Sequence, residues 1–178
     1  MGFARTEADP GTHGCLCARS MGDIRCCRSR HRLNIGCFGI EASALAPSYT
    51  GFDNNPDLIE IANRQSPRAL SSGKKLPFMC CDFDAFHTHN DRKFDVIFSF
   101  AVHVWIGIPI AEYISRLRSM LAPQGILVIE CNNLDKNDHD FLSNMRLFRE
   151  TGFMLLHRGE IIDDGIIRRT FCVLKSLH

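Results

Sequence analysis

The sequence lacks an apolar run long enough to cross a bilayer, and it lacks an excess of charge of either sign. Its 178 residues carry 21 Lys and Arg against 20 Asp and Glu, which gives a net charge of +1. Proteins that bind nucleic acid or anionic membranes usually carry a clear excess of positive charge. We therefore expect no nucleic-acid partner and no membrane partner. The N-terminus also lacks the apolar core of a secretory signal, which predicts a cytoplasmic location.

The nine cysteines lack the paired Cys-x-x-Cys spacing of zinc sites. We therefore predict no metal in the polar leader, although it holds several thiols and imidazoles: His13, Cys15, Cys17, Cys26, Cys27 and His31. The other five cysteines lie inside apolar segments, where a free cysteine behaves as a small buried hydrophobe. These are Cys37, Cys80, Cys81, Cys131 and Cys172.

The distribution of apolar residues divides the chain into two parts. Residues 1–30 have few large apolar side chains and no clear period, which predicts an irregular or disordered leader. Residues 31–178 show the periodic patterns of a single domain with a sizeable core. We find no internal repeat and no sign of a second domain.

Apolar runs and helical patterns alternate along this domain. The predicted strands are Arg32–Cys37, Tyr49–Asp53, Leu76–Cys81, Phe94–Phe100 and Ile126–Cys131. The predicted helices are Ile40–Ala46, Pro56–Gln65, Pro109–Leu121 and Asp138–Thr151. Ser66–Lys75 reads as a loop, and Ala85–Lys93 as a loop or a short helix. Two further strands, Phe153–Ile162 and Ile166–Leu174, flank an Asp-Gly pair that is typical of a hairpin.

This order predicts a doubly wound α/β fold with a mostly parallel, seven-stranded sheet. The terminal hairpin places an antiparallel strand in that sheet. In such sheets a ligand binds beyond the carboxyl ends of the strands, where the strand order reverses. The residues that follow these ends are therefore the candidate cofactor-binding residues: Gly36, Cys37, Gly39, Asp53, Asn54, Asp82, Phe83, Ser99 and Phe100.

The candidate residues suit a cofactor that contains ribose and adenine. A glycine turn lets a ligand approach the backbone, and the helix after it directs its positive dipole end at the ligand. Asp53 can accept hydrogen bonds from both ribose hydroxyls, and Asp82 from the adenine amine. Each residue also has a structural interpretation, because turns favour glycine and aspartates cap helices. Their order on successive strand ends favours the cofactor.

Several of these segments resemble the class I S-adenosylmethionine-dependent methyltransferases. The resemblance covers Leu33 to Lys175 and includes "LNIGCFG", "YTGFDNNPDLIEIAN", "CDF", "KFDVIFSFAVHVW" and "LRSMLAPQGILVIE". It implies the class I methyltransferase fold with its antiparallel hairpin, and S-adenosyl-L-methionine as cofactor. A nicotinamide-dependent oxidoreductase is the weaker alternative, since the sequence lacks a full Gly-x-Gly-x-x-Gly turn.

The first motif departs from the pattern of the family. The family usually shows an acid and three alternating glycines, whereas Asn34 stands at the acid position and Phe38 interrupts the glycines. One glycine inserted between Cys37 and Phe38 would restore the pattern. Only eleven residues separate Cys37 from Tyr49, which is short for a strand-helix-strand crossover. Two accounts remain open: a truncated relative whose core still folds, and a shortened loop that still binds the cofactor.

The resemblance implies methyl transfer by in-line displacement, with a small molecule as acceptor. His103, just beyond the fourth strand, is the candidate catalytic base, because imidazole titrates near neutrality. The alternative is that His103 packs with Val102 and Trp105 as a lid. The Asn/Asp-Pro-Pro-aromatic motif of amino-group methylation of DNA is absent after the fourth strand. A catalytically impaired binding or interaction domain is the second hypothesis, and the sequence leaves the oligomeric state open.

Overall fold

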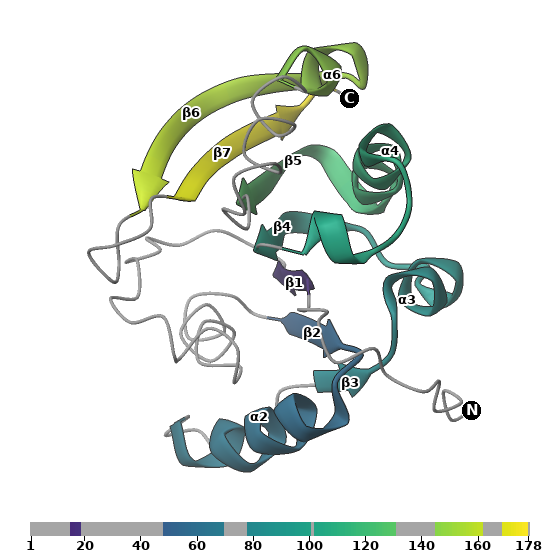
Figure 1. Ribbon diagram of the computed structural model, residues 1–178, viewed down its shortest axis with the longest axis vertical. Helices are drawn as coiled ribbons and strands as arrows, with labels where there is room; N and C mark the ends of the chain where they lie inside the picture. Colours follow the sequence, from purple (N-terminus) through teal and green to yellow (C-terminus); the bar gives the residue numbers. More distant parts are fainter. Residues whose placement is uncertain are drawn as a thin grey trace.

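A computed structural model describes residues 15–18, 48–69, 78–100, 102–130, 145–161 and 169–177. The side chains of a few of these residues are not described, those of the first segment among them. The described residues form one seven-stranded sheet in the order β3-β2-β1-β4-β5-β7-β6 (Figure 1). Among the helices described, none combines the length and the apolar character that a bilayer crossing requires.

The strands and helices alternate along most of the chain. The strands are β1 Cys15–Ala18, β2 Tyr49–Asp53, β3 Phe78–Cys80, β4 Phe94–Phe100, β5 Leu121–Glu130, β6 Phe153–Ile161 and β7 Arg169–Ser176. The helices are α2 Pro56–Ala69, α3 Phe83–His89, α4 Ile110–Met120 and α6 Met145–Glu150, with a 3₁₀ turn, η2, at His103–Trp105. The predicted α/β class is therefore correct, and the terminal hairpin is present as the antiparallel pair β6–β7.

The sheet is mixed, so the prediction of a mostly parallel sheet is wrong. Only β2–β3 and β4–β5 are parallel pairs. Strand β7 runs antiparallel to β5, as the hairpin requires. The remaining antiparallel pairs come from β1, which runs antiparallel to both β2 and β4.

Strand β1 fills the position between β2 and β4 in the middle of the sheet. It comes from the leader, for which the sequence predicted no regular structure. Its register pairs Leu16 with Gly51 on one side and with Phe98 on the other. The predicted strand Arg32–Cys37 and the predicted helix Ile40–Ala46 lie outside the described residues.

Local patterns predicted most other elements well. Strands β2 and β4 have the predicted bounds. Helix α2 continues four residues beyond its predicted end and includes Pro67 in its last turn. Strand β5 begins at Leu121, before the predicted start at Ile126, and Gln124 within it has a φ of 63°. The first part of the predicted Asp138–Thr151 helix, like the Asp164-Gly165 turn, lies outside the described residues.

The sheet separates two hydrophobic clusters. The larger cluster joins the sheet to α3, α4 and α6 through residues such as Phe86, Leu117 and Phe148. The smaller cluster joins it to α2 through Ile59 and Ala62, which pack near Tyr49 and Phe78. Both faces of the sheet are therefore covered by helices. This burial fixes the strand ends, where the candidate residues lie.

Candidate functional site

Asp53 ends β2, a strand whose five residues are all buried. Its Oδ1 accepts a hydrogen bond of 2.8 Å from the backbone amide of Asn55, which holds the carboxylate at the carboxyl end of the strand. The next side chain, Asn54, is half-buried. Within the described part of the chain, its buried Oδ1 has no hydrogen-bond partner. A buried amide oxygen without a donor is costly, so this atom is an acceptor that a ligand can satisfy.

Helix α2 begins with its own cap. Asn55 Oδ1 accepts hydrogen bonds from the amides of Asp57 and Leu58, at 3.0 and 3.4 Å. Pro56 follows at the first helical position, where its missing N–H costs nothing. Because Asn55 serves as the N-cap, the interpretation of Asp53 as the cap of this helix is wrong.

Asp82 leaves the sheet next to Asp53. Strands β2 and β3 are parallel, and the amide of Cys81 donates to the carbonyl oxygen of Asp53 at 3.1 Å. Asp82 follows immediately and is half-buried. Its Oδ1 accepts from the amide of Ala85 at 2.6 Å, which makes it the N-cap of α3. The chain therefore brings Asp53 and Asp82 together at the carboxyl ends of the parallel strands β2 and β3. One oxygen of Asp82 has a structural role there, as the cap of α3.

Cys81 lies between the two aspartates in this turn. Burial, followed by the charge of Asp82 and the thiol of Cys80, raises its pKa to about 12. The thiol therefore stays neutral at physiological pH, as predicted for a buried cysteine. Cys80 is half-buried, and its Sγ lies 3.8 Å from the carbonyl oxygen of Asn54.

Two predicted site residues point into the core. Phe83 is buried, and its ring centroid lies 4.8 Å from that of Tyr113 in an edge-on contact. Ser99 is fully buried, with its Oγ 2.8 Å from the hydroxyl of Tyr113. Both side chains thus support the packing of α3 and α4 on the sheet. Phe100 is half-buried and contacts Phe98 on the other face, at a centroid distance of 5.7 Å.

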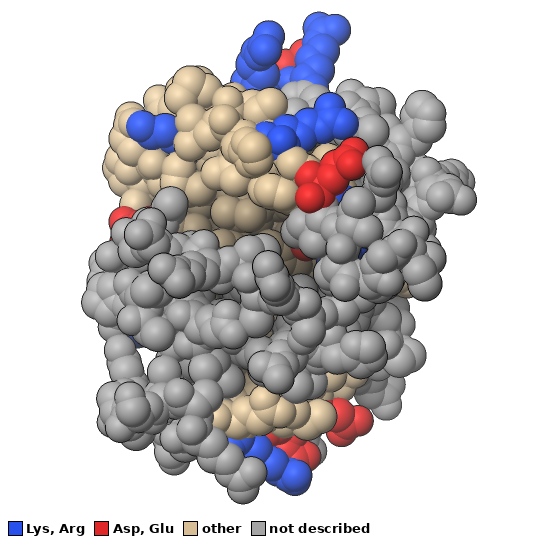
Figure 2. Space-filling view, turned by 90° about the vertical axis from the view of Figure 1, so that its left-hand side faces the viewer, with Lys and Arg blue, Asp and Glu red and all other residues tan. Residues whose placement is uncertain are grey.

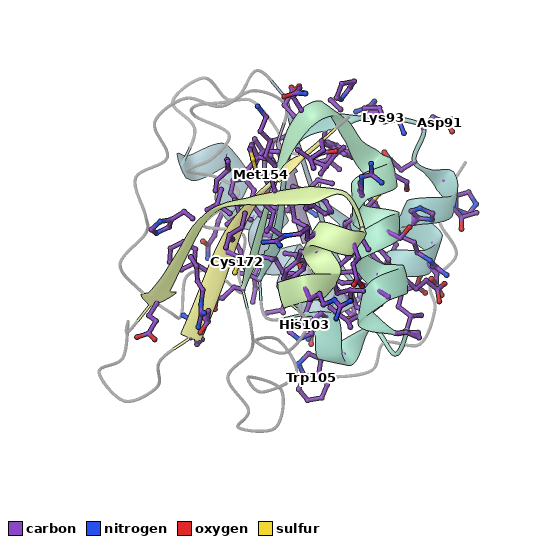
Figure 3. All side chains as sticks on the ribbon, turned by 90° about the horizontal axis from the view of Figure 1, so that it is seen from above. Asp91, Lys93, His103, Trp105, Met154 and Cys172 are labelled. Atoms are coloured by element: carbon purple, nitrogen blue, oxygen red, sulfur yellow. The ribbon has the colours of Figure 1, made fainter. Side chains whose placement is uncertain are left out.

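His103 and Trp105 belong to η2, directly after the carboxyl end of β4. Val102 is buried and anchors this turn in the larger hydrophobic cluster. His103 is half-buried, whereas Trp105 is 43% exposed. Figure 3 shows the Trp105 ring projecting beyond the ribbon at the same end of the molecule as His103. The predicted glycine turn, with Gly36, Cys37 and Gly39, lies outside the described residues.

A buried ion pair lies at the carboxyl end of β5. The side chain of Glu130 is 1% exposed and that of Arg169, at the start of β7, is 9% exposed; Arg169 Nη1 donates to Glu130 Oε1. Glu130 lies within the predicted strand Ile126–Cys131, but the sequence gave no signal for Arg169. One of two adjacent arginines after a turn looks like a solvated residue, whereas the fold buries Arg169 beside Glu130.

Hydrogen-bond acceptors thus gather at the carboxyl ends of the strands. Carboxylates follow β2 and β3, and an unsatisfied amide oxygen lies beside the first. These groups suit a ligand that offers hydroxyl and amine donors, such as a nucleoside. The fold and these strand ends define an α/β domain of the class that binds nucleotide-type cofactors.

The comparisons with known proteins identify the family. Residues 33–129, more than half of the chain, match the methyltransferase domain family, and the chain belongs to it. It is thus a class I S-adenosylmethionine-dependent methyltransferase by family, and its cofactor class is S-adenosyl-L-methionine. No curated protein matches the sequence.

Solved structures support the same fold. The N-methyltransferase NodS from Bradyrhizobium japonicum WM9 is 16% identical, with a TM-score of 0.65 over 81% of this chain and 82% of that one. Magnesium protoporphyrin IX methyltransferase from Synechocystis PCC 6803, with bound SAH, is 18% identical, with a TM-score of 0.57 over 80% and 69%. An rRNA methylase from Streptococcus thermophilus is 12% identical, with a TM-score of 0.60 over 80% and 81%. At these identities the likeness concerns the fold.

Proposed function

We propose that the protein transfers the methyl group of S-adenosyl-L-methionine to a small-molecule acceptor. One observation carries the proposal: Asp53, Asn54 and Asp82 converge at one edge of the sheet, and the buried Asn54 Oδ1 has no partner within the described part of the chain. Asp53 would accept the ribose hydroxyls, and Asn54 would add an acceptor beside it. The second oxygen of Asp82 would accept from the adenine amine.

Two further contacts complete the proposed cofactor pocket. The backbone of the Gly36–Gly39 turn would face the methionine part of the cofactor. Phe83, Ser99 and Phe100 would contribute to the pocket through their backbone positions at the strand ends, because the side chains of Phe83 and Ser99 are buried and that of Phe100 contacts Phe98 on the other face. For Phe83 and Ser99 this role is indirect, because their side chains contact Tyr113. They would support the turn that carries Asp82.

The reaction requires an acceptor to be held in line with the reactive methyl group. When bound, the cofactor supplies an electrophilic methyl carbon attached to a positively charged sulfur. The protein contributes position, because holding two reactants aligned removes much of the entropic barrier. His103 would accept the proton that an oxygen or nitrogen acceptor releases. Trp105, exposed beside it, would cover the acceptor from solvent.

The proposed acceptor class depends on charge. The net charge of +1 gives no general attraction for nucleic acid. The solved structures with this fold include methyltransferases named for small molecules and for RNA, so the fold does not choose between acceptors. A cytoplasmic location stays a prediction from the sequence.

A second candidate function is a methyltransferase-like binding domain without activity. The shortened turn between Gly36 and Gly39 favours it. Such a domain would bind the cofactor weakly and release no methylated product.

Calorimetric titration with S-adenosylmethionine and S-adenosylhomocysteine tests the proposal. We expect saturable heat from the wild type and about 10- to 100-fold weaker binding for Asp53→Asn, which removes one charged acceptor. Asp57→Ala removes an exposed carboxylate in the first turn of α2 and serves as the matched control, with unchanged affinity. No heat from the wild type at millimolar ligand would exclude methyl transfer.

Two additional variants separate the two candidate functions. His103→Ala is expected to keep cofactor affinity and to lose product formation in a screen with labelled methyl donor. Insertion of one glycine between Cys37 and Phe38 is expected to strengthen binding if the turn is merely short. Cofactor binding without any labelled product across acceptor classes would favour the binding domain.

A further inference from the structure

Most of the large hydrophobic side chains that are exposed in the described part of the chain lie near the edge strand β6. Five large hydrophobic residues are exposed in the described part of the chain, and four of them lie together: Met154, Leu155, Leu156 and Leu177, at 44–54% exposure. The amide of Leu177 donates to the carbonyl oxygen of Gly152 at 3.1 Å, which holds the end of the chain beside the start of β6. We call these four residues the β6 patch.

The β6 patch borders a hollow. Its volume is about 690 Å³, and among the described residues it is lined by Arg146, Phe148, Arg149, Phe153, Met154, Leu155 and Leu177. Figure 2 shows the upper part of this face as a largely tan surface with Lys and Arg at its rim. A contiguous apolar surface of this kind on a folded domain usually marks an interaction site.

Strand β6 also offers a free edge. It pairs with β7 on one side, and within the described residues no strand pairs with its other side. Its C-terminal half carries Arg158 and Glu160, which are charges of the kind that protect edge strands. Its N-terminal half carries Met154, Leu155 and Leu156 in succession. A bulge between Leu155 and His157 interrupts the pairing with β7 here. The half of the edge that carries no Lys, Arg, Asp or Glu therefore coincides with the apolar patch.

We propose that the β6 patch is the contact surface of a homodimer, in which the N-terminal halves of two β6 strands lie antiparallel about a two-fold axis at Leu155. In this register Met154 of each copy faces Leu156 of the other. The apolar residues then cover one another, and side chains of the second copy fill the hollow. A two-fold contact of one surface with itself is the commonest form of protein association.

The charges of the patch favour a second copy as the occupant. In the same register, Glu160 of one copy comes level with the end of α6 in the other, where Arg149 is exposed. The symmetry generates this opposite-charge contact twice. Arg146 already pairs with Glu150 at 2.7 Å within its own helix, so we assign the contact to Arg149, and Glu160 would make it in addition to an interaction within its own chain. Only about five residues of each β6 strand would pair with the other copy. Because this contact is short, we expect a reversible dimer rather than an obligate one.

The proposed dimer leaves the cofactor edge accessible. The β6 patch lies beside the start of β6, where Phe153 pairs with Ser176. Lys175, the preceding residue of β7, is level with Ile126 near the beginning of the β5–β7 pairing, whereas Glu130 lies at the carboxyl end of β5. The β6 patch and the cofactor site are therefore at opposite ends of the sheet, and Glu160, which lies nearer the carboxyl end of β5, is on the edge strand farthest from β2 and β3. Cofactor titration thus reports on the proposed function independently of dimerisation.

Sedimentation equilibrium over a range of concentrations tests the dimer. We expect concentration-dependent dimerisation of the wild type, and monomers for Leu155→Glu, whose side chain is already 45% exposed in the monomer. Thr88→Glu places the same charge on the exposed surface of α3 and serves as the control, with wild-type dimerisation. A wild type that stays monomeric, or that binds anionic vesicles through this patch without dimerising, would overturn the proposal.

Cross-linking and charge exchange test the register. Leu155→Cys is expected to form a disulfide-linked dimer on oxidation, beyond any linkage of the wild type. His157→Cys is not, because its two copies would lie four residues, or about 13 Å, apart along the strands. Glu160→Arg is expected to weaken the dimer about tenfold, and Arg149→Glu added to it to restore the affinity. Cross-linking through position 157 in preference to 155, or no restoration, would overturn the register.

Discussion

At the scale of single residues, the candidate site depends on the hydrogen-bond acceptors that follow strands β2 and β3. Asp53 Oδ1 accepts a hydrogen bond from the backbone amide of Asn55 at 2.8 Å, and Asp82 Oδ1 accepts one from the amide of Ala85 at 2.6 Å. Asn54 differs, because its buried Oδ1 accepts from no group in the described part of the chain. A residue that is kept at a local cost in stability is a better functional candidate than one that caps a helix.

Replacement of Asn54 tests this distinction. Asn54→Ala removes a buried oxygen that has no partner, so we expect the free energy of unfolding to stay the same or to rise by up to about 1 kcal/mol. Cofactor affinity is expected to fall about tenfold, as for the loss of one hydrogen bond. Urea unfolding and calorimetry measure the two effects. Asn63→Ala, which removes a 3.5 Å hydrogen bond to the carbonyl oxygen of Phe78, is the control, and we expect unchanged affinity.

The buried thiols predict a dependence of stability on alkaline pH. Burial raises the pKa of Cys81 to about 12 and that of Cys172 to about 11, from the ordinary value of 9.0. Both thiols are protonated in the folded and unfolded states below pH 9. Above pH 9 the unfolded state loses these protons first, so the stability that the neutral thiols provide is lost progressively between pH 9 and 11–12.

Urea unfolding at pH 8 to 11 measures this loss. Each thiol is expected to lower the free energy of unfolding by up to about 1.4 kcal/mol per pH unit in that window. A Cys81→Ala/Cys172→Ala variant is less stable at pH 8, but its stability is expected to fall less steeply with pH, which separates the thiols from lysine and tyrosine. Equal slopes for the two proteins would show that these thiols do not titrate in the unfolded protein alone.

At the scale of elements, the ends of helices and strands depend on a few backbone positions. Gly152 follows α6 with a φ of +83°, a conformation that favours glycine. A Cβ atom at this position would lie 2.8 Å from Cζ of Arg118, so the guanidinium of α4 packs directly against the end of α6. Gly107 has a similar φ of +75°, but a Cβ atom there meets nothing within 4 Å.

Alanine at these two glycines would have a similar backbone strain from the positive φ, but only alanine at position 152 would also contact Arg118. Gly107→Ala is expected to lower the free energy of unfolding by about 1 kcal/mol, the cost of a left-handed alanine. Gly152→Ala also displaces the Arg118 guanidinium, but this is the far end of a flexible side chain, so the variant is expected to cost only slightly more, about 1–2 kcal/mol. Urea unfolding of both variants measures the difference. Equal losses would show that Arg118 moves aside without cost.

Local sequence patterns explain which helices and strands could be predicted from the sequence. Strands β2 and β4 were predicted with their observed bounds because each is a short, continuous apolar run between polar turns. The end of α2 was missed because Pro67 lies in the last turn, where it removes only one hydrogen bond. The start of β5 was missed because Pro123 precedes the segment that pairs with β7, so its missing N–H breaks no ladder there.

At the scale of the whole molecule, the arrangement of the strands was harder to predict than their positions. Strand β1 is four residues long, and nothing in the sequence of the leader distinguishes it from irregular chain. Its place in the sheet depends on pairing with strands more than thirty residues away in sequence, a contact that no local period reveals. The ion pair between Glu130 and Arg169 was missed for the same reason.

Strand β1 is therefore the element whose contribution most needs a direct test. Leu16 pairs with Gly51 on one side and Phe98 on the other, so a change of its backbone acts in the middle of the sheet. Leu16→Pro removes one N–H and leaves a buried carbonyl of a neighbouring strand without its donor, which costs about 1–3 kcal/mol in addition to steric strain. Leu16→Val keeps the N–H and favours a strand, and it serves as the control.

Urea unfolding and hydrogen exchange together decide whether β1 joins the two halves of the sheet. We expect Leu16→Pro to lower the unfolding midpoint and to reduce the protection of amides in β2 and β4, whereas those of β7 keep theirs because they pair with β5 and β6. Leu16→Val is expected to behave as the wild type. A proline variant with the wild-type midpoint and full protection of both strands would show that β2 and β4 do not depend on β1. Because the candidate cofactor residues follow β2, β3 and β4, the strength of this pairing also sets how firmly the edge of the site is held.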